Sequence, residues 1–124
     1  MLLCIDDDSL ILGAVSKLFR GAMTARCIAD GVRVAGSVKP SVILVDLILG
    51  DEWGLDAIPM LLQVSPESKV IVFTAKTNNE LRRLSYAAGA IAFIDKMHLS
   101  RLKEVVDDIV TAPSRQTTKK AALH

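Results

Sequence analysis

Residues 42–46 read VILVD: four consecutive apolar residues that favour β-structure, followed at once by an acid. A short continuous apolar run of this kind is typical of a strand buried on both faces, as strands are in a parallel sheet. Residues 2–8 read LLCIDDD, so a second apolar run also ends in acids. Together the two stretches predict an α/β fold with carboxylates gathered at one edge of its sheet.

Segments with helical periodicity alternate with apolar runs along the chain, and glycine or proline stands near several of the expected helix ends. The alternation predicts strands at residues 2–5, 25–29, 42–45, 70–73 and 91–94, helices at residues 10–19, 30–39, 57–62, 78–88 and 99–109, and a loop at residues 46–54. Five strands alternating with five helices predict a doubly wound parallel sheet of order 2-1-3-4-5, covered on both faces. Its first and third strands are then neighbours, and ligands bind at their carboxyl ends.

Local signals predict where some of these helices begin. Asp8 precedes the first helix and is expected to be its N-cap. Thr77 and Glu80 fit a capping box at the start of the fourth helix. If Asp56 is the N-cap of the third helix, Pro59 falls at the third helical position, where a helix needs no backbone N–H donor.

The chain has 124 residues, of which 51% are apolar and 23% charged, as in a globular domain with a core of its own. Residues 1–110 hold 12 basic and 14 acidic side chains, whereas residues 111–124 hold three basic ones and no acid. We therefore expect one domain over residues 1–110 and a basic, flexible tail or linker over residues 111–124. The net charge of +1 predicts neither a nucleic acid nor a membrane as a partner of the domain.

Cysteine content and hydropathy argue against several further classes of protein. Cys4 and Cys27 both lie in apolar runs, where buried unpaired thiols are expected rather than a disulfide. No set of cysteines and histidines has the spacing of a zinc site. The sequence has neither a secretory leader nor an apolar run of ~18 residues, so we expect a cytoplasmic protein without a membrane-spanning helix.

Polar side chains stand at the ends of four expected strands. Asp6 and Asp7 follow the first strand, and Asp46 follows the third. Thr74 ends the fourth strand, and Lys96 lies two residues beyond the fifth. Neighbouring strands are ~4.8 Å apart, so the three carboxylates should converge on one shallow pocket. A hard divalent cation relieves their mutual repulsion; Mg²⁺ is the natural choice and Mn²⁺ an alternative. A carboxylate of this group is also able to attack phosphorus and become an aspartyl phosphate.

The motifs DDD, LVD followed by GDEWG, FTA and AGAIAFIDK together resemble the receiver domain of two-component response regulators, over residues 1–110. The resemblance implies the fold of the chemotaxis receiver CheY, which has the strand order expected above. It also implies that Asp46 accepts a phosphoryl group and helps to bind Mg²⁺. Asp7 is then a direct ligand of the ion and Asp6 a more water-mediated one. The backbone carbonyl of Ile48 completes the protein's share of the metal site.

The same resemblance assigns roles to further residues. Thr74 corresponds to the hydroxyl that bonds a phosphoryl oxygen, and Lys96 to the lysine that pairs with the phosphate. Phe93 occupies the position of the aromatic residue that switches between an outward and an inward pose. Ile48 and Lys76 occupy two positions that tune the lifetime of the phosphate. An apolar residue beside a long cationic one predicts slow self-dephosphorylation.

The function implied by the resemblance is phosphorelay signal transduction. A sensor histidine kinase or a phosphotransfer protein donates the phosphoryl group, and the domain contributes self-catalysed transfer and dephosphorylation rather than an enzyme activity. Phosphorylation then switches the surface of the fourth helix, fifth strand and fifth helix, to which a downstream effector domain or protein binds. A second copy of the chain is a further candidate partner. The kinase, the effector and the length of the native regulator stay open.

Three other interpretations compete with this one. A receiver-like interaction module that is never phosphorylated would not need the full set of pocket residues. A phosphatase of the haloacid-dehalogenase class needs Asp-x-Asp after its first strand and a larger, cap-bearing chain, and Asp46-Leu47-Ile48 fails that pattern. A flavin carrier needs a phosphate-binding first loop, where this chain has DDDSL. One position departs from the family pattern, in which proline often follows the lysine: here Met97 follows Lys96. We expect a trans peptide bond there, because a cis bond before a non-proline residue costs ~3 kcal/mol.

Overall fold

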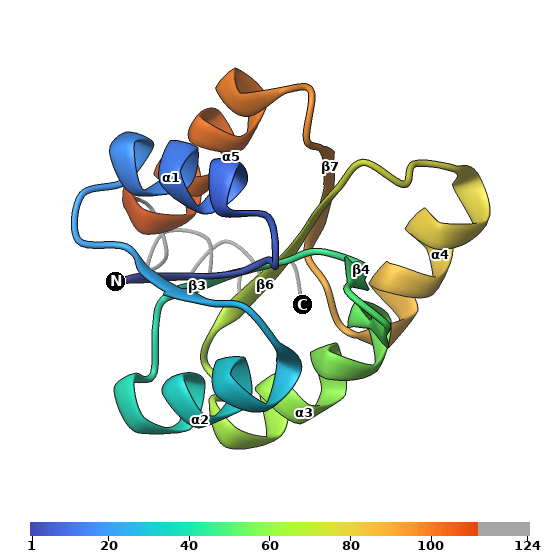
Figure 1. Ribbon diagram of the computed structural model, residues 1–124, viewed down its shortest axis with the longest axis horizontal. Helices are drawn as coiled ribbons and strands as arrows, with labels where there is room; N and C mark the ends of the chain where they lie inside the picture. The colour runs from blue at the N-terminus through green and yellow to red at the C-terminus, as the bar shows by residue number, and fades with distance from the viewer. Residues whose placement is uncertain (112–124) are drawn as a thin grey trace, which may run out of the picture.

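A computed structural model describes residues 1–111, which form a parallel sheet of strand order β2-β1-β3-β6-β7 with helices on both faces (Figure 1). This is the predicted order 2-1-3-4-5, because strands β4 and β5 form a separate small sheet. The predicted tail lies outside the described residues except for Thr111, the last residue of the final helix. The strands are β1 (Leu2–Ile5), β2 (Met23–Ala25), β3 (Val42–Val45), β4 (Ile48–Leu49), β5 (Glu52–Trp53), β6 (Lys69–Thr74) and β7 (Ala92–Asp95).

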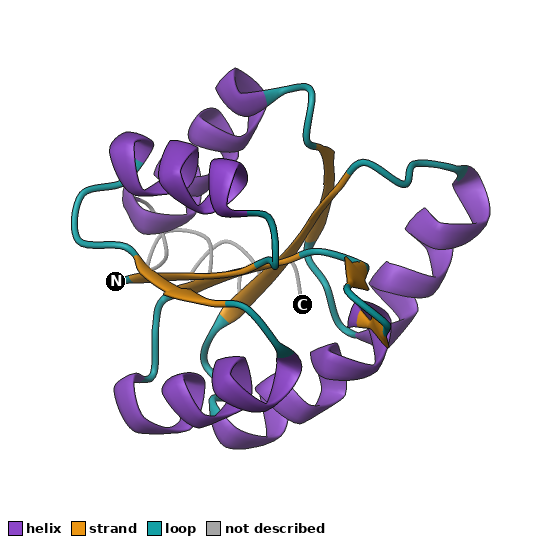
Figure 2. Cartoon of the chain, in the orientation of Figure 1, coloured by secondary structure: helices purple, strands orange, loops and turns teal. Residues whose placement is uncertain are grey.

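Four α-helices connect the strands of the large sheet, a fifth follows the last strand, and a 3-10 turn precedes the third helix (Figure 2). Helices α1 and α5 cover one face of the sheet, and α2, α3 and α4 cover the other (Figure 1). Within residues 1–111, no helix has both the length and the apolar content needed to cross a bilayer. The helices are α1 (Ser9–Leu18), α2 (Ile28–Val38), α3 (Ala57–Val64), α4 (Asn79–Ala88) and α5 (Leu99–Thr111), with the 3-10 turn at Gly54–Asp56.

Each central strand contributes to two apolar cores. In β1, Leu3 and Ile5 pack on the side of α2, α3 and α4. Leu2 and Cys4 pack on the side of α1 and α5. Successive side chains of a strand point to opposite faces, so a strand covered on both faces needs an apolar residue at every position. This explains the continuous apolar runs from which the fold was predicted.

The second strand and the second helix begin earlier than predicted. Residues 25–29 were expected to form a strand, but only Ala25 belongs to β2, and α2 starts at Ile28. Cys27 is the half-buried N-cap of α2 rather than a buried strand residue. A short apolar run does not distinguish a strand from the first turn of a buried helix, which accounts for the error. Both cysteines are free thiols, as predicted.

The helix caps agree with the sequence at α1 and differ at α4. The carboxylate of Asp8 accepts a hydrogen bond from the N–H of Leu10 at 2.9 Å and caps α1, as predicted. In α4 the cap is Asn78, which accepts from the N–H of Leu81 at 2.8 Å, so the capping box at Thr77 was wrong by one residue. The asparagine amide supplies the same kind of acceptor as a threonine hydroxyl.

The predicted loop at residues 46–54 contains the β4–β5 hairpin instead. Gly50 lies in its turn with a φ of 63°, a left-handed conformation that favours glycine. The hairpin runs into the 3-10 turn and then directly into α3. Asp56 does occupy the N-cap position of α3, and Pro59 its third position, as predicted. Because the 3-10 turn leads directly into α3, Asp56 has helical backbone angles and its side chain makes no capping hydrogen bond.

Candidate functional site

The acids that follow β1 and β3 lie together at the carboxyl edge of the sheet. Ile5 and Val45 are partners in the parallel pairing of these strands, so the next residues, Asp6 and Asp46, emerge at the same level. Each of the carboxylates of Asp6, Asp7 and Asp46 offers an oxygen, and these oxygens all lie within 4.8 Å of one another. The predicted convergence of the three acids is therefore present, with Asp7 exposed and the other two buried.

The ammonium group of Lys96 balances two of these carboxylates. Its Nζ lies 2.6 Å from Oδ2 of Asp46 and 2.7 Å from Oδ2 of Asp6. Burial opposes the charge on Lys96, but the hydrogen bonds to the two carboxylates outweigh it, so the pKa of Lys96 lies above its usual value. The backbone N–H of Lys96 donates to the carbonyl of Thr74 at 3.0 Å, which holds the lysine beside the end of β6. The Lys96–Met97 peptide bond is trans, as predicted.

Asp6 is the most enclosed acid of the group, with 1% of its surface exposed. Its Oδ1 accepts a hydrogen bond from the backbone N–H of Asp8 at 2.9 Å, while its Oδ2 pairs with Lys96. Burial nevertheless raises the pKa of Asp6, because these bonds offset the loss of hydration only in part. Burial, with the nearby charge of Asp6, also raises the pKa of the Cys4 thiol to about 12. Additional positive charge at this edge of the sheet would therefore stabilise the ionised form of Asp6.

Thr74 ends β6, the strand next to β3, and is fully buried. Its hydroxyl oxygen accepts a hydrogen bond from the backbone N–H of Lys76 at 3.2 Å, which orders the start of the loop between β6 and α4. The side chain of Lys76 is exposed, and so is that of Ile48, which leaves 40% of its surface to solvent. The structure thus places a buried hydroxyl at the acidic edge and two exposed side chains on the loops around it.

The segment after Asp46 folds back over the backbone of that residue. The N–H of Ile48 donates to Oδ1 of Asp46 at 3.3 Å, and the N–H of Gly54 donates to the carbonyl of Leu47 at 2.7 Å. A Cβ atom on Gly54 would lie 1.8 Å from the carbonyl oxygen of Asp46. Only glycine permits this approach, so the hairpin that follows Asp46 is positioned by direct backbone contact.

The donor set at this edge fits a hard divalent cation. Three carboxylates supply only oxygen ligands, which Mg²⁺ prefers, and one ammonium group leaves their charge incompletely balanced. Elsewhere in residues 1–111, no second group of three acidic, histidine or cysteine side chains brings its ligand atoms together in this way. The chemistry of the donor set thus agrees with the cation site expected from the sequence.

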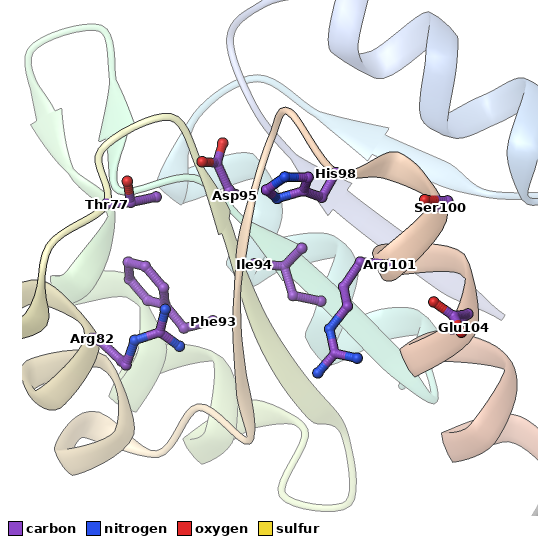
Figure 3. Close-up of a pocket in the computed structure, with 9 residues that line it drawn as sticks. All are labelled: Thr77, Arg82, Phe93, Ile94, Asp95, His98, Ser100, Arg101 and Glu104. Atoms are coloured by element: carbon purple, nitrogen blue, oxygen red, sulfur yellow. The ribbon is translucent and has the colours of Figure 1, made fainter.

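A groove of about 650 Å³ lies beside the acidic edge of the sheet, between α4, β7 and α5 (Figure 3). Phe93 of β7 is buried at its floor, and the guanidinium carbon of Arg82 lies 5.0 Å from the centroid of its ring. His98 and Arg101 line the wall on the α5 side. Phe93, the aromatic residue to which the sequence assigns a switching role, is therefore buried, with Arg82 across its ring.

A family model described as the response regulator receiver domain matches residues 2–107. The chain belongs to this family. The receiver domain is 35% identical over 77 residues to the photosynthetic apparatus regulatory protein RegA of Cereibacter sphaeroides, covering 59% of this chain and 42% of the relative. It is 28% identical over 100 residues to the response regulator GacA of Pseudomonas aeruginosa, covering 76% of this chain and 47% of the relative. The receiver domain therefore spans less than half the length of these two relatives.

Solved structures share the fold of the receiver domain. A response regulator from Burkholderia pseudomallei, described with a phosphorylated aspartic acid, a calcium ion and citrate, matches with a TM-score of 0.79 at 24% identity, covering 99% of this chain and 74% of that one. A CheY-like receiver domain protein from Methanospirillum hungatei JF-1 matches with a TM-score of 0.73 at 26% identity, covering 86% and 93%. These matches confirm the predicted CheY-like fold, and the family model confirms the predicted response regulator receiver domain.

Sequence reasoning missed two side chains that surround the acidic edge of the receiver domain. Glu52 accepts a hydrogen bond from the backbone N–H of Ile28, 24 residues earlier in the chain. Arg26 donates to the backbone carbonyl of Asp7, at a separation of 19 residues. Glu52 lies in the GDEWG motif and Arg26 in the strand predicted at residues 25–29, but neither pattern indicates a partner, so no signal in the sequence predicted these contacts.

Proposed function

We propose that the receiver domain accepts a phosphoryl group on Asp46 from the phosphohistidine of a sensor histidine kinase or a phosphotransfer protein. One observation carries the proposal: the carboxylate of Asp46 is buried among two further carboxylates, with the ammonium of Lys96 at 2.6 Å. An acid that served only solubility would lie in water, away from like charges. This grouping instead suits a site that receives a cation and a phosphoryl group.

In the proposed transfer, an oxygen of Asp46 bonds to phosphorus while the N–P bond of the phosphohistidine breaks. The leaving imidazole keeps the bonding electron pair and takes up a proton. The domain contributes position, because Asp46 follows a strand that is paired on both sides and its N–H donates to the carbonyl of Ile5 at 3.1 Å. Such transfer and the later self-dephosphorylation are the only chemistry proposed for the domain.

The carboxylates of Asp6, Asp7 and Asp46, with the carbonyl of Ile48, would hold Mg²⁺, or Mn²⁺ as an alternative. When held there, the cation would neutralise charge on the phosphoryl oxygens. Asp7 is exposed and suits a direct ligand. Asp6 already accepts a backbone N–H and pairs with an ammonium group, which suits a contact through water.

Lys96 and Thr74 are proposed to bind the transferred group. Before transfer the ammonium of Lys96 pairs with Asp46, and afterwards it would pair with a phosphoryl oxygen at nearly the same place. The hydroxyl of Thr74 accepts from the N–H of Lys76, which leaves its own proton available for donation to the phosphoryl group. Ile48 and Lys76 are proposed to hinder attack by water and so to prolong the life of the phosphate.

The proposed output is a change in the surface formed by α4, β7 and α5. A phosphoryl group that draws on Thr74 also acts on Lys76, because its N–H is bonded to the same hydroxyl. The loop from there leads into α4, which carries Arg82 above Phe93. A downstream effector domain or protein, or a second copy of the chain, is the proposed partner of this surface. The proposal puts these events in the cytoplasm.

Labelling with a small radioactive phosphodonor such as acetyl phosphate, in the presence of Mg²⁺, tests the proposal. Wild-type protein should take up label, and EDTA should prevent it. The variant Asp46→Asn should remain unlabelled, whereas Asp51→Asn, which changes an exposed acid of the nearby hairpin turn, should label normally. Undiminished labelling of Asp46→Asn would remove the central assignment. A folded wild type that no phosphodonor labels would favour the unphosphorylated interaction module.

A further inference from the structure

Glu52, on the hairpin after Asp46, makes a contact that the proposed transfer does not use. We propose that Glu52 is a positioning residue for the cation site. By capping helix α2 from outside, it holds the β4–β5 hairpin, and with it the backbone of Ile48, in the geometry that the cation requires. The inference rests on the proposed function.

The contact joins two elements that are far apart in the sequence. Oε1 of Glu52 accepts a hydrogen bond from the N–H of Ile28 at 3.0 Å, in a partly buried setting. Ile28 is the first residue of α2, and the N-cap residue Cys27 provides no capping hydrogen bond from its side chain. The first N–H groups of a helix lack intrahelical partners and carry partial positive charge, so a carboxylate stabilises them. Glu52 thus supplies the cap that α2 lacks.

Glu52 also belongs to the segment that shapes the acidic edge. It pairs with Leu49 in the ladder between β4 and β5. The adjoining residue Ile48 donates its N–H to the carboxylate of Asp46. Each strand of this hairpin has only two residues, so its own ladder does little to fix its position. The bond to α2 is therefore a second anchor of the hairpin, in addition to the backbone contact of Gly54 with Leu47, and it limits movement of the hairpin relative to Asp46.

The corner between β2 and α2 reaches the other wall of the pocket as well. Arg26, two residues before Ile28, donates to the backbone carbonyl of Asp7 at 2.8 Å. The turn of the hairpin lies close to the same acid, because a Cβ atom on Gly50 would be 3.8 Å from Oδ2 of Asp7. The corner is therefore tied to Asp7 through Arg26 and to the hairpin through Glu52. The corner therefore limits the movement of both segments that carry proposed ligands of the cation.

Calorimetric titration with MgCl₂ tests this role on the whole chain. Glu52→Ala should bind Mg²⁺ roughly 10-fold more weakly than wild type, the loss expected when a residue that orients a metal site is removed. Glu52→Gln keeps an oxygen that accepts the N–H of Ile28 and should restore most of the affinity. Asp51→Ala removes one negative charge from the neighbouring exposed position and should change the affinity by less than about twofold.

A fourth variant breaks the same contact from the other side. Ile28→Pro removes the N–H donor but no charge, and proline is well tolerated at the first position of a helix. Cys27, the residue before it, is already extended, with φ −148° and ψ 166°, as a residue before proline must be. This variant should also weaken Mg²⁺ binding. In EDTA, amide exchange at Ile28 should be faster in Glu52→Ala than in wild type and slow again in Glu52→Gln.

Several outcomes would overturn the inference. Equal weakening by Glu52→Ala and Asp51→Ala would show a general effect of charge rather than positioning. Faster exchange at Ile28 with unchanged Mg²⁺ affinity would show a cap that serves only the stability of α2. Either result leaves the proposed function intact as long as wild type binds Mg²⁺ and is labelled. A wild type that neither binds Mg²⁺ nor takes up label would refute both proposals.

Discussion

Nζ of Lys96 lies 2.6 Å from Oδ2 of Asp46, so the acid proposed to accept the phosphoryl group is already paired with a cation of the protein itself. The same ammonium lies 2.7 Å from Oδ2 of Asp6. One positive charge therefore serves two buried carboxylates, and the third acid beside them adds to the repulsion. A divalent ion held by Asp6, Asp7 and Asp46 would relieve the negative charge that the lysine leaves uncompensated.

Removal of this ammonium should make stability depend more strongly on Mg²⁺. Lys96→Met leaves two buried carboxylates without their shared partner, so in EDTA the free energy of unfolding should fall by about 1–3 kcal/mol. Mg²⁺ should recover more stability in this variant than in wild type. Urea denaturation with and without Mg²⁺ measures both effects. Lys103→Met is the control, because Lys103 pairs with Asp107 at the surface, where a pair contributes about 0–1 kcal/mol. Equal losses in the two variants would contradict the prediction.

Gly54 should tolerate no side chain. A Cβ atom there would meet the carbonyl of Asp46 at 1.8 Å, so Gly54→Ala must displace either the hairpin or the backbone of the acid. We expect a loss of about 2–4 kcal/mol of stability, together with weaker phosphoryl labelling. Gly13→Ala provides the contrast, because a Cβ atom on that residue of α1 meets nothing within 4 Å, and alanine should stabilise a helix by about 0.5–1 kcal/mol. Thermal melts of both variants measure these opposite changes, and a Gly54→Ala variant as stable as wild type would contradict the prediction.

The buried thiol of Cys4 should cause a loss of stability at alkaline pH. Burial raises its pKa from 9.0 to about 12, so above pH 9.0 the thiol ionises in the unfolded chain but stays protonated in the folded one. Stability should therefore fall with rising pH between these values, by about 1.4 kcal/mol per pH unit from this group. Cys4→Ala should show a shallower decline. Alkylation of the native protein should modify the half-buried Cys27 before Cys4, and equal rates would contradict the assignment.

The architecture of the receiver domain was readable from its sequence because its strands are buried on both faces. The runs at Leu2–Ile5 and Val42–Val45 have no polar residue, as strands covered on both faces of a parallel sheet require, and their alternation with helical segments indicated such a sheet. The acids at their ends had to meet, because β1 and β3 pair in register. The prediction was wrong at Cys27, because the apolar run there is compatible with both a strand and the first turn of a buried helix.

The tertiary contacts around the site could not be predicted from the sequence in the same way. Glu52 and Ile28 meet across 24 residues, and nothing local distinguishes Glu52 from a solvated hairpin acid. The contact depends on how the hairpin lies against α2, which is a result of tertiary packing. The burial of Phe93 beneath Arg82 likewise follows from the packing of α4 on β7. A sequence pattern locates the groups that carry charge, but not the bonds that hold them in place.

Ile48 and Lys76 should govern how long the phosphate survives. Wild-type protein, freed of phosphodonor, should keep its label for minutes or longer, because these side chains restrict the approach of water. Ile48→Ala and Lys76→Ala should each lose label several times faster, as followed by the decay of bound radioactivity. Leu10→Ala changes an apolar side chain that is 82% exposed on α1 and should leave the decay unchanged. Loss of label from wild type within seconds, without a phosphatase, would show that the two residues do not protect it.

The most direct test of the account is to locate the phosphoryl group chemically. Borohydride reduces an aspartyl phosphate to homoserine, and mass spectrometry of the digested protein then identifies the residue that carried the group. After incubation with phosphodonor and Mg²⁺, we predict homoserine at position 46 and unchanged aspartates at positions 6 and 7. Homoserine at either of those two positions, or labelled protein without homoserine at position 46, would contradict the assignment of Asp46 as the acceptor.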